Sequence, residues 1–370
     1  PRKPSGFSLS YVTERLNRSM FKTGFILGRR DDLIWFLLMP FFAVAVALAC
    51  QHWLSAIAMV SVGLCITIPH HFVTWLRAYG TKEDWQRWKL RLIVGPVVLF
   101  ALVLAGLTWA PWTLFLVLIL WDHQHTIMQQ YGFARIYDFK AKSGGLRTPR
   151  FDLSLFWILF VNLFVTAPLF TRFWVRELYR WNLPVSVATV EIIQTVSWCL
   201  TGLFLCFYLI HIIRSLRSGD SVNPIKFVFI GSSFFLWYFT SWHTDSILMY
   251  GIAHRLMHGL QYIVIVYWYL RRKQQSRDPV DRDRVAGLVQ PGKVLRFVAA
   301  CLVYAVLYQL IVGQPLERFG FGVVNFAGQF SYDETFAVYA EAIISFAGVT
   351  HYYLDSFIWK VRDERIQEGL

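Results

Sequence analysis

Long apolar stretches alternate with short polar segments along almost the whole of this 370-residue chain. Ten of the stretches approach or exceed the roughly 20 residues that a helix needs to cross a bilayer. They run over residues 33–50, 54–76, 92–109, 112–135, 152–170, 186–213, 225–242, 247–270, 295–313 and 335–359. The pattern predicts an all-α protein, a polytopic transmembrane helix bundle of about ten spans.

The charges between the stretches orient this bundle. Basic residues cluster at 29–30, 77–91, 135–150, 214–226, 271–296 and 360–365, which lie on one side of a ten-span arrangement. Only 171–184, with Arg172, Arg176 and Arg180, places several arginines on the other side. Because basic loops stay in the cytoplasm, we expect both termini to be cytoplasmic and the protein to be integral to a bacterial inner membrane.

The same pattern divides the chain into five parts. Residues 1–32 form a basic cytoplasmic segment, 33–270 a core of about eight spans, and 271–294 a polar, solvated cytoplasmic loop. A final helix pair follows over 295–359, and 360–370 form a cytoplasmic tail.

Composition narrows the class of protein. Apolar residues make up 56% of the chain, charged residues only 16%, and the mean hydropathy is +0.44, which leaves no sizeable soluble domain. The net charge of +13 comes from short loops, so we expect no nucleic-acid partner. The five cysteines lie in apolar stretches without a CxxC pair, which is typical of small buried hydrophobes.

The most informative polar residues are histidines inside the apolar stretches. Ionisable side chains in a membrane are costly and usually functional, and imidazole is the commonest metal ligand. Seven of the ten histidines are of this kind: His70, His71, His123, His125, His254, His258 and His351. Their four spans all run from outside to inside, and they lie about 10 to 25 Å from the basic residue that closes each span. We therefore expect a metal site in the cytoplasmic half of the membrane.

Helical spacing distinguishes among these candidates. His254 and His258 share one face at i, i+4 and can chelate one metal. Asp355 lies one turn after His351, as a ligand or as the acceptor for a ligand's second N–H.

The other two pairs are less regular. His123 and His125 point roughly 160° apart on an ideal helix, so one is a ligand or the site holds two ions. His70 and His71 are about 100° apart, and Pro69 can kink their helix and turn both rings inward.

Two charged residues near the histidines are candidates for catalysis. Asp122 precedes His123, and it or Asp355 would act as a general base if the metal were zinc. Arg255 would hold an anionic group of a substrate, or would simply pair with Asp245. Each single histidine has an equally ordinary interpretation as a buried group bonded to a hydroxyl or a backbone carbonyl.

The donor set suggests which metal is bound. It is rich in nitrogen, poor in carboxylate and free of thiolate, which suits iron, copper or zinc. We expect one or two non-haem iron ions that activate dioxygen and oxidise a lipid-soluble small molecule by hydroxylation, desaturation or C=C cleavage. Membrane lipids and an electron-donor protein are the other expected partners, and replacing His254 or His258 with Ala should remove the metal.

Two short motifs resemble the bacterial β-carotene dioxygenases, a family of polytopic membrane proteins with four histidines on one iron. They are Ile68-Pro69-His70 near the end of a span and the HxxxH of His254 and His258. The resemblance implies iron-ligand roles for His70, His254, His258 and His125. The first span here lacks the histidine that this family has, and His123, His351 and Asp355 have no counterpart in its pattern.

Three alternatives follow from the same residues. Pairs of histidines on facing helices can hold haem in an electron-transfer protein. A relay of His, Asp and Arg can serve a proton-coupled transporter. A zinc ion at the same place would make the protein a membrane hydrolase.

Overall fold

The computed structural model describes residues 20–54, 56–244, 246–312, 334–361 and 363–370. This part of the chain is helical and contains no β-strand, which confirms the all-α prediction for it. Every predicted span corresponds to a helix. The first is a π-helical turn, η1 (Leu33–Leu37), followed by α3 (Met39–Trp53). The others are α4 (Ala56–Tyr79), α5 (Lys82–Trp109), α6 (Pro111–Ala141), α7 (Thr148–Thr166), α9 (Val187–Arg217), α10 (Pro224–His243), α11 (Ile247–Gln275), α13 (Val294–Val312) and α14 (Glu334–Ile358).

Within the described ranges, four segments are long and apolar enough to cross a membrane: Arg29–Trp53, α5, α7 and α9. The first of these begins with the short helix α2 (Arg29–Asp32). Several apolar helices could therefore span a bilayer, whereas the number ten stays a prediction. Helices α6 and α11 are not among these four segments. Both carry buried histidines and glutamines, which lower the mean hydropathy of the helix.

Local sequence explains where several helices begin. Pro111, Pro168 and Pro224 occupy the first turns of their helices, where a missing N–H costs nothing. The side chain of Ser186 caps α9 by accepting the Thr189 N–H, and Asn223 caps α10 in the same way. Pro69 lies inside α4, and the helix continues through it.

Two segments differ from what the sequence predicted. The arginine-bearing segment after α7 is an amphipathic helix, α8 (Pro168–Arg180), too short to span, with Leu169 and Phe170 buried. The predicted polar loop 271–294 contains helical segments, while many of its residues, such as Val280 and Arg284, are exposed as expected of a polar loop. Its first residues extend α11, and η2 (Pro279–Asp281) and α12 (Ala286–Val289) follow, because Val285 and Val289 bury apolar surface.

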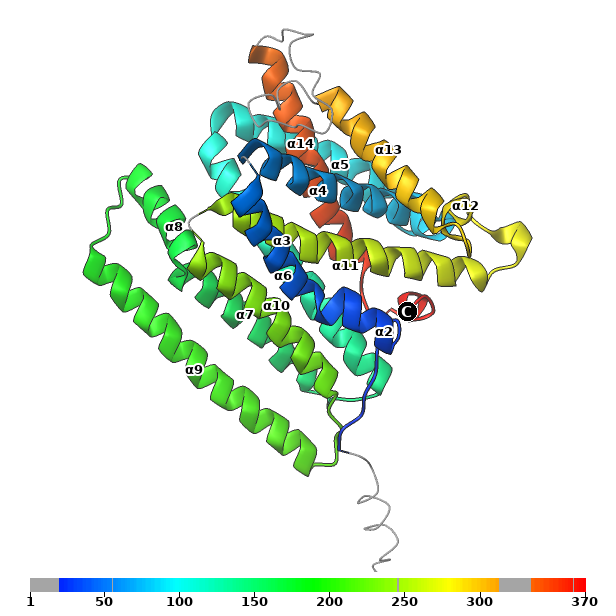
Figure 1. Ribbon diagram of the computed structural model, residues 1–370, viewed down its shortest axis with the longest axis horizontal. Helices are drawn as coiled ribbons and strands as arrows, with labels where there is room; N and C mark the ends of the chain where they lie inside the picture. Colours follow the sequence, from blue (N-terminus) through cyan, green and yellow to red (C-terminus); the bar gives the residue numbers. More distant parts are fainter. Residues whose placement is uncertain (1–19, 55, 245, 313–333, 362) are drawn as a thin grey trace, which may run out of the picture.

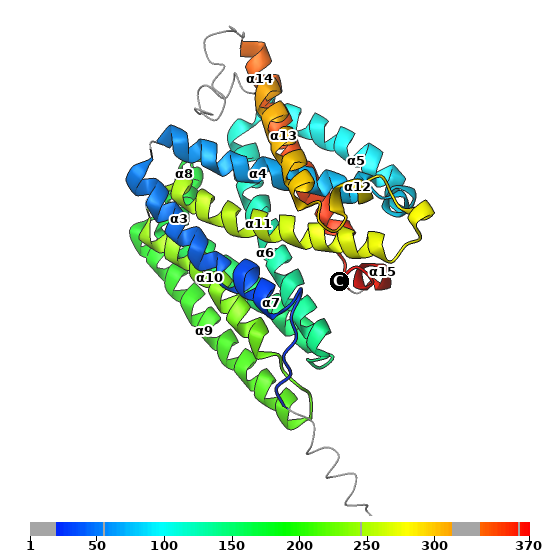
Figure 2. The ribbon, with the colours of Figure 1, turned by 45° about the vertical axis from the view of Figure 1, so that its right-hand side comes forward.

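The helices form two groups on either side of a central pair. In Figures 1 and 2, α4 and α11 lie side by side across the middle of the molecule, and both start on the left of Figure 1 and end on its right. On one side lie α3, α7, α9 and α10, and on the other side lie α5, α13 and α14. The final helix pair packs against α4 and α5, so it is continuous with the core.

The outermost helices expose apolar side chains. Helix α9 packs mainly on α7 and leaves Ile192, Leu200 and Leu203 more than half exposed. Exposed apolar surface of this extent is a feature of helices that face lipid. Seven histidines are buried instead, and His70, His125, His258 and His351 among them lie where α4, α6, α11 and α14 meet.

Candidate metal centre

Four histidines from four helices meet in the interior of the molecule. They are His70 of α4, His125 of α6, His258 of α11 and His351 of α14. One ring nitrogen from each lies within 4.8 Å of the others, and all four side chains are buried. Ring centroids are 4.1 Å apart for His70 and His351, 4.6 Å for His125 and His351, and 4.6 Å for His70 and His258. We call these four residues the histidine group.

The separations between the ligand nitrogens of the group lie on both sides of the value that a tetrahedral ion requires. Nitrogen ligands bind zinc at about 2.0–2.1 Å, which places neighbouring ligand atoms roughly 3.3 Å apart. The Nε2 atoms of His70 and His351 are 2.6 Å apart, and the other ligand atoms lie at up to 4.8 Å. Small rotations of these rings would therefore accommodate one ion.

Unpaired polar atoms also indicate a ligand. The Nε2 atom of His125 and both ring nitrogens of His258 are buried and have no hydrogen-bond partner. Buried polar atoms in native proteins are nearly always paired. A metal ion is the ligand that would engage several imidazole nitrogens at once, so the residues present fit one.

A chain of hydrogen bonds fixes the orientation of His351. A carboxylate only accepts, so Tyr262 donates its O–H to Asp355 Oδ1 at 2.7 Å. Thr74 donates to the Tyr262 oxygen at 2.9 Å and lies 2.5 Å from His351 Nδ1. With the single Thr74 proton donated to Tyr262, His351 donates Nδ1–H to Thr74. Its Nε2 lone pair therefore faces the histidine group, which is the tautomer that binds a metal.

Asp355 borders the group without being one of the four. Its Oδ2 atom is 3.7 Å from His125 Nε2 and 3.8 Å from His351 Nε2. The carboxylate thus holds Tyr262 with one oxygen and turns the other toward the ligand nitrogens. It is placed to be a fifth ligand or to exchange a proton with a group bound there.

His71 also lies beside the group but outside it. Its ring centroid is 5.0 Å from that of His70 and 5.3 Å from that of His351, and its Nε2 atom is buried without a partner. Neither of its nitrogens belongs to the set of four that lie within 4.8 Å of one another.

His254 is not part of the group, although the HxxxH spacing predicts that it binds with His258. Trp237, whose indole can only donate, gives its N–H to His254 Nδ1 at 3.0 Å. The remaining nitrogen, Nε2, then carries the proton and donates to Thr126 at 3.1 Å, since Thr126 gives its own proton to the Asp122 carbonyl. Both nitrogens are occupied, so this ring has no lone pair for a metal.

His123 is separated from His125 as their angular spacing predicts. Its ring is stacked against Phe160 and Tyr250, and Tyr250 O–H lies 2.5 Å from its Nδ1 atom. It lies next to His254, with ring centroids 5.4 Å apart. These two histidines and their hydrogen-bond partners form a second cluster beside the histidine group.

The two residues predicted to be catalytic lie at the edge of this second cluster. Asp122 accepts the Tyr352 O–H at 2.9 Å, and its side chain is 31% exposed, with Oδ2 3.9 Å from His254 Nε2. Arg255 is partly buried and forms no ion pair with any carboxylate in the described ranges. Its predicted partner Asp245 lies outside them.

The sequence did not lead us to the residues that fix the histidines by hydrogen bonds. Thr74 and Tyr262 orient His351, and Trp237 donates a hydrogen bond to Nδ1 of His254. A signal was present for two of them, because Thr74 lies one helical turn after His70 and Tyr262 one turn after His258. Trp237, on a different helix, gave no such signal.

Comparison with protein-family models, curated proteins and solved structures finds no match to this chain.

Proposed function

We propose that this chain is an integral membrane metalloenzyme whose histidine group binds one non-haem iron ion and oxidises a lipid-soluble substrate with dioxygen. The observation that carries the proposal is the convergence of four buried imidazole nitrogens within 4.8 Å, with unpaired nitrogens on His125 and His258. The four imidazoles come from four separate helices. Buried nitrogens without a hydrogen-bond partner lower the folding stability unless a ligand binds them.

The donor set favours iron within this proposal. It consists of neutral nitrogens with one carboxylate nearby and no thiolate, which suits a metal that keeps open positions. Iron at such a site supplies redox chemistry with dioxygen. The chain's own residues orient the ligands through Thr74 and Tyr262, exclude bulk water by burial, and offer the Asp355 carboxylate to accept or return a proton.

Zinc is the second candidate, and the position of Asp355 favours it. An oxygen of this carboxylate lies 3.7 Å from His125 Nε2, within reach of a molecule held by the same nitrogens. That is where a general base for hydrolysis would stand. Haem is disfavoured, because four nitrogens packed within 4.8 Å leave no room for a porphyrin plane.

The membrane setting completes the proposal. Both termini face the cytoplasm of a bacterial inner membrane, and the iron lies in the cytoplasmic half. An electron-donor protein supplies reducing equivalents. Carotenoid cleavage remains one option among the oxidations, since the motif resemblance is limited to residues 68–70 and the HxxxH.

Metal analysis of the detergent-purified protein tests this function. We expect about one iron per chain, with no Soret band in the absorption spectrum of the same sample. Zinc in place of iron would redirect the proposal to hydrolysis, and a chain that binds no transition metal would overturn it.

A further inference from the structure

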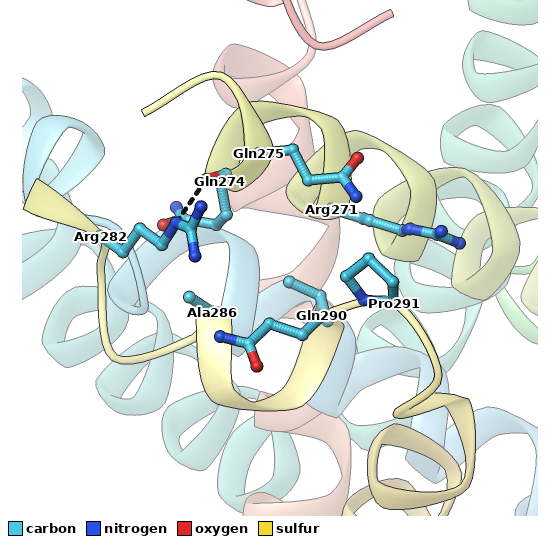
Figure 3. Close-up of a pocket in the computed structure, with 8 residues that line it drawn as sticks. Arg271, Gln274, Gln275, Arg282, Ala286, Gln290 and Pro291 are labelled. Atoms are coloured by element: carbon cyan, nitrogen blue, oxygen red, sulfur yellow. Dashed lines mark hydrogen bonds between the residues drawn. The ribbon is translucent and has the colours of Figure 1, made fainter. Parts of the chain in front are cut away.

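A second site lies where α11 ends, away from the histidine group. A cavity of about 360 Å³ separates the last turn of α11 from α12 (Figure 3). Its lining combines two arginines and three glutamine side chains with three apolar residues: Arg271, Arg282, Gln274, Gln275, Gln290, Ala286, Val289 and Pro291. None of these eight described residues carries a carboxylate, and the volume lies in the range of sites that hold small molecules.

The two arginines of this cavity differ from their neighbours in having no acidic partner. Arg277 pairs with Glu83 at 2.9 Å and with Asp283 at 2.6 Å, and Lys273 pairs with Glu83 at 2.8 Å. In the described part of the chain, Arg271 and Arg282 pair with no carboxylate. Glu83 and Asp283 are thus already paired with other cations, and the two arginines that line the cavity keep their positive charge without an ion-pair partner.

Hydrogen bonds leave donors available to a ligand. Arg282 gives Nε–H to the Gln274 carbonyl at 3.1 Å, and its terminal nitrogens have no acceptor among the described residues. The Nε atom of Arg271 is buried without an acceptor. Gln290 accepts from Lys293 through Oε1 at 2.6 Å, so its NH₂ group is left to donate. Figure 3 places Arg271 and Gln275 on one side of the cavity and Arg282 on the other.

We propose that this cavity binds the phosphate group of an anionic ligand. Guanidinium groups bind phosphate oxygens bidentately, and amide N–H groups add neutral donors. The site is independent of the metal, because Arg271 lies 13 residues beyond His258 on the same helix, about 20 Å along its axis.

A membrane phospholipid headgroup and a soluble phosphate compound both present this chemistry. The position at a helix end favours the headgroup: Arg271 lies over the Trp268 ring at 4.9 Å, and Trp with Arg at the end of a span is typical of the membrane–water interface. Basic pockets between spans are known to hold such headgroups.

The test measures bound lipid by native mass spectrometry after reconstitution in vesicles of equal parts phosphatidylcholine and phosphatidylglycerol. The variant carries Arg271→Gln and Arg282→Gln. The matched control carries Arg284→Gln and Arg296→Gln, which remove the same charge from exposed positions outside the cavity. In a second arm, pyrophosphate is titrated into lipid-free wild-type protein and into both variants.

A headgroup site predicts that wild type and control enrich phosphatidylglycerol, whereas the cavity variant binds it at least about tenfold more weakly. A soluble ligand predicts no lipid enrichment, with pyrophosphate bound by wild type and control but not by the cavity variant. Displacement of retained lipid by pyrophosphate in the wild type supports the shared site even if the variant fails to fold. Absence of both ligands from wild type, or equal losses in the two double variants, overturns the proposal.

Discussion

Replacing His258 and His254 separately distinguishes a metal ligand from a hydrogen-bonded neighbour on the same helix. The two residues lie one turn apart on α11 and are equally buried, each 2% exposed. His258 has two unpaired ring nitrogens and belongs to the histidine group, whereas both nitrogens of His254 are engaged by Trp237 and Thr126. We therefore expect His258→Ala to lose the metal and His254→Ala to retain it.

The first substitution should mainly lower the affinity for metal, and the second should mainly lower the folding stability. A four-ligand site of about 10–16 kcal/mol contributes roughly 3 kcal/mol per ligand, so His258→Ala should weaken metal binding on the order of 10²-fold. His254→Ala orphans the buried Trp237 N–H, which costs about 1–3 kcal/mol of folding stability, in addition to the cavity that either change creates. In metal-free protein, His254→Ala should therefore unfold at the lower temperature.

The assay measures iron per chain after dialysis against a buffered iron concentration close to the wild-type Kd. Thermal unfolding of chelator-treated samples gives the stability of each variant without metal. Equal loss of iron from both variants would refute the assignment of hydrogen bonds to His254, and loss from His254→Ala alone would refute the histidine group itself.

Three further predictions follow from contacts away from the ligand atoms. Thr74→Val removes the acceptor for His351 Nδ1–H and should weaken metal binding about 10–100-fold by equilibrium dialysis, whereas Thr74→Ser should bind as wild type does; equal binding by both would contradict the proposed orientation. Asp84→Asn strips the buried Arg77 of its ion-pair partner and should cost about 3–5 kcal/mol in chemical denaturation, so a loss below 1 kcal/mol would show the pair to be dispensable. Gly132→Ala meets no atom within 4 Å inside α6 and should stabilise the protein by about 0.5–1 kcal/mol; a lower melting temperature would contradict this.

The fold was largely predictable because apolar length alone marks a long helix. Each predicted stretch is helical, with ends displaced by several residues where polar turns extend the helix beyond the apolar core, as at the end of α6. Helix α8 was missed since its arginines interrupt the apolar run, and only their spacing of about one turn marks it as a surface helix. The crossing of α4 and α11 over the other helices depends on side-chain packing, which linear periodicity does not encode.

Two sequence features bear on which histidines come together: the angle between histidines on one helix and the position of each histidine along its span. The 160° between His123 and His125 implied either a single ligand from this pair or a two-ion site, and only His125 lies in the histidine group. The prediction of a common depth placed His70, His258 and His351 in one cluster, and these three do lie together. Sharing a face was not sufficient for His254. One helical turn also displaces a side chain by about 5.4 Å along the axis, which moves this ring into the layer of Trp237.

Packing alone does not explain the histidine group. A structural imidazole in an apolar interior normally has both nitrogens paired, and His254 demonstrates that this chain can do so with Trp237 and Thr126. One turn away, His258 has neither nitrogen paired, and His125 leaves its Nε2 unpaired. Three such atoms cost about 3–9 kcal/mol together, which is comparable to the whole stability of a typical domain. The contrast between paired and unpaired histidines on one helix is what a ligand-binding site requires and what a packing layer would avoid.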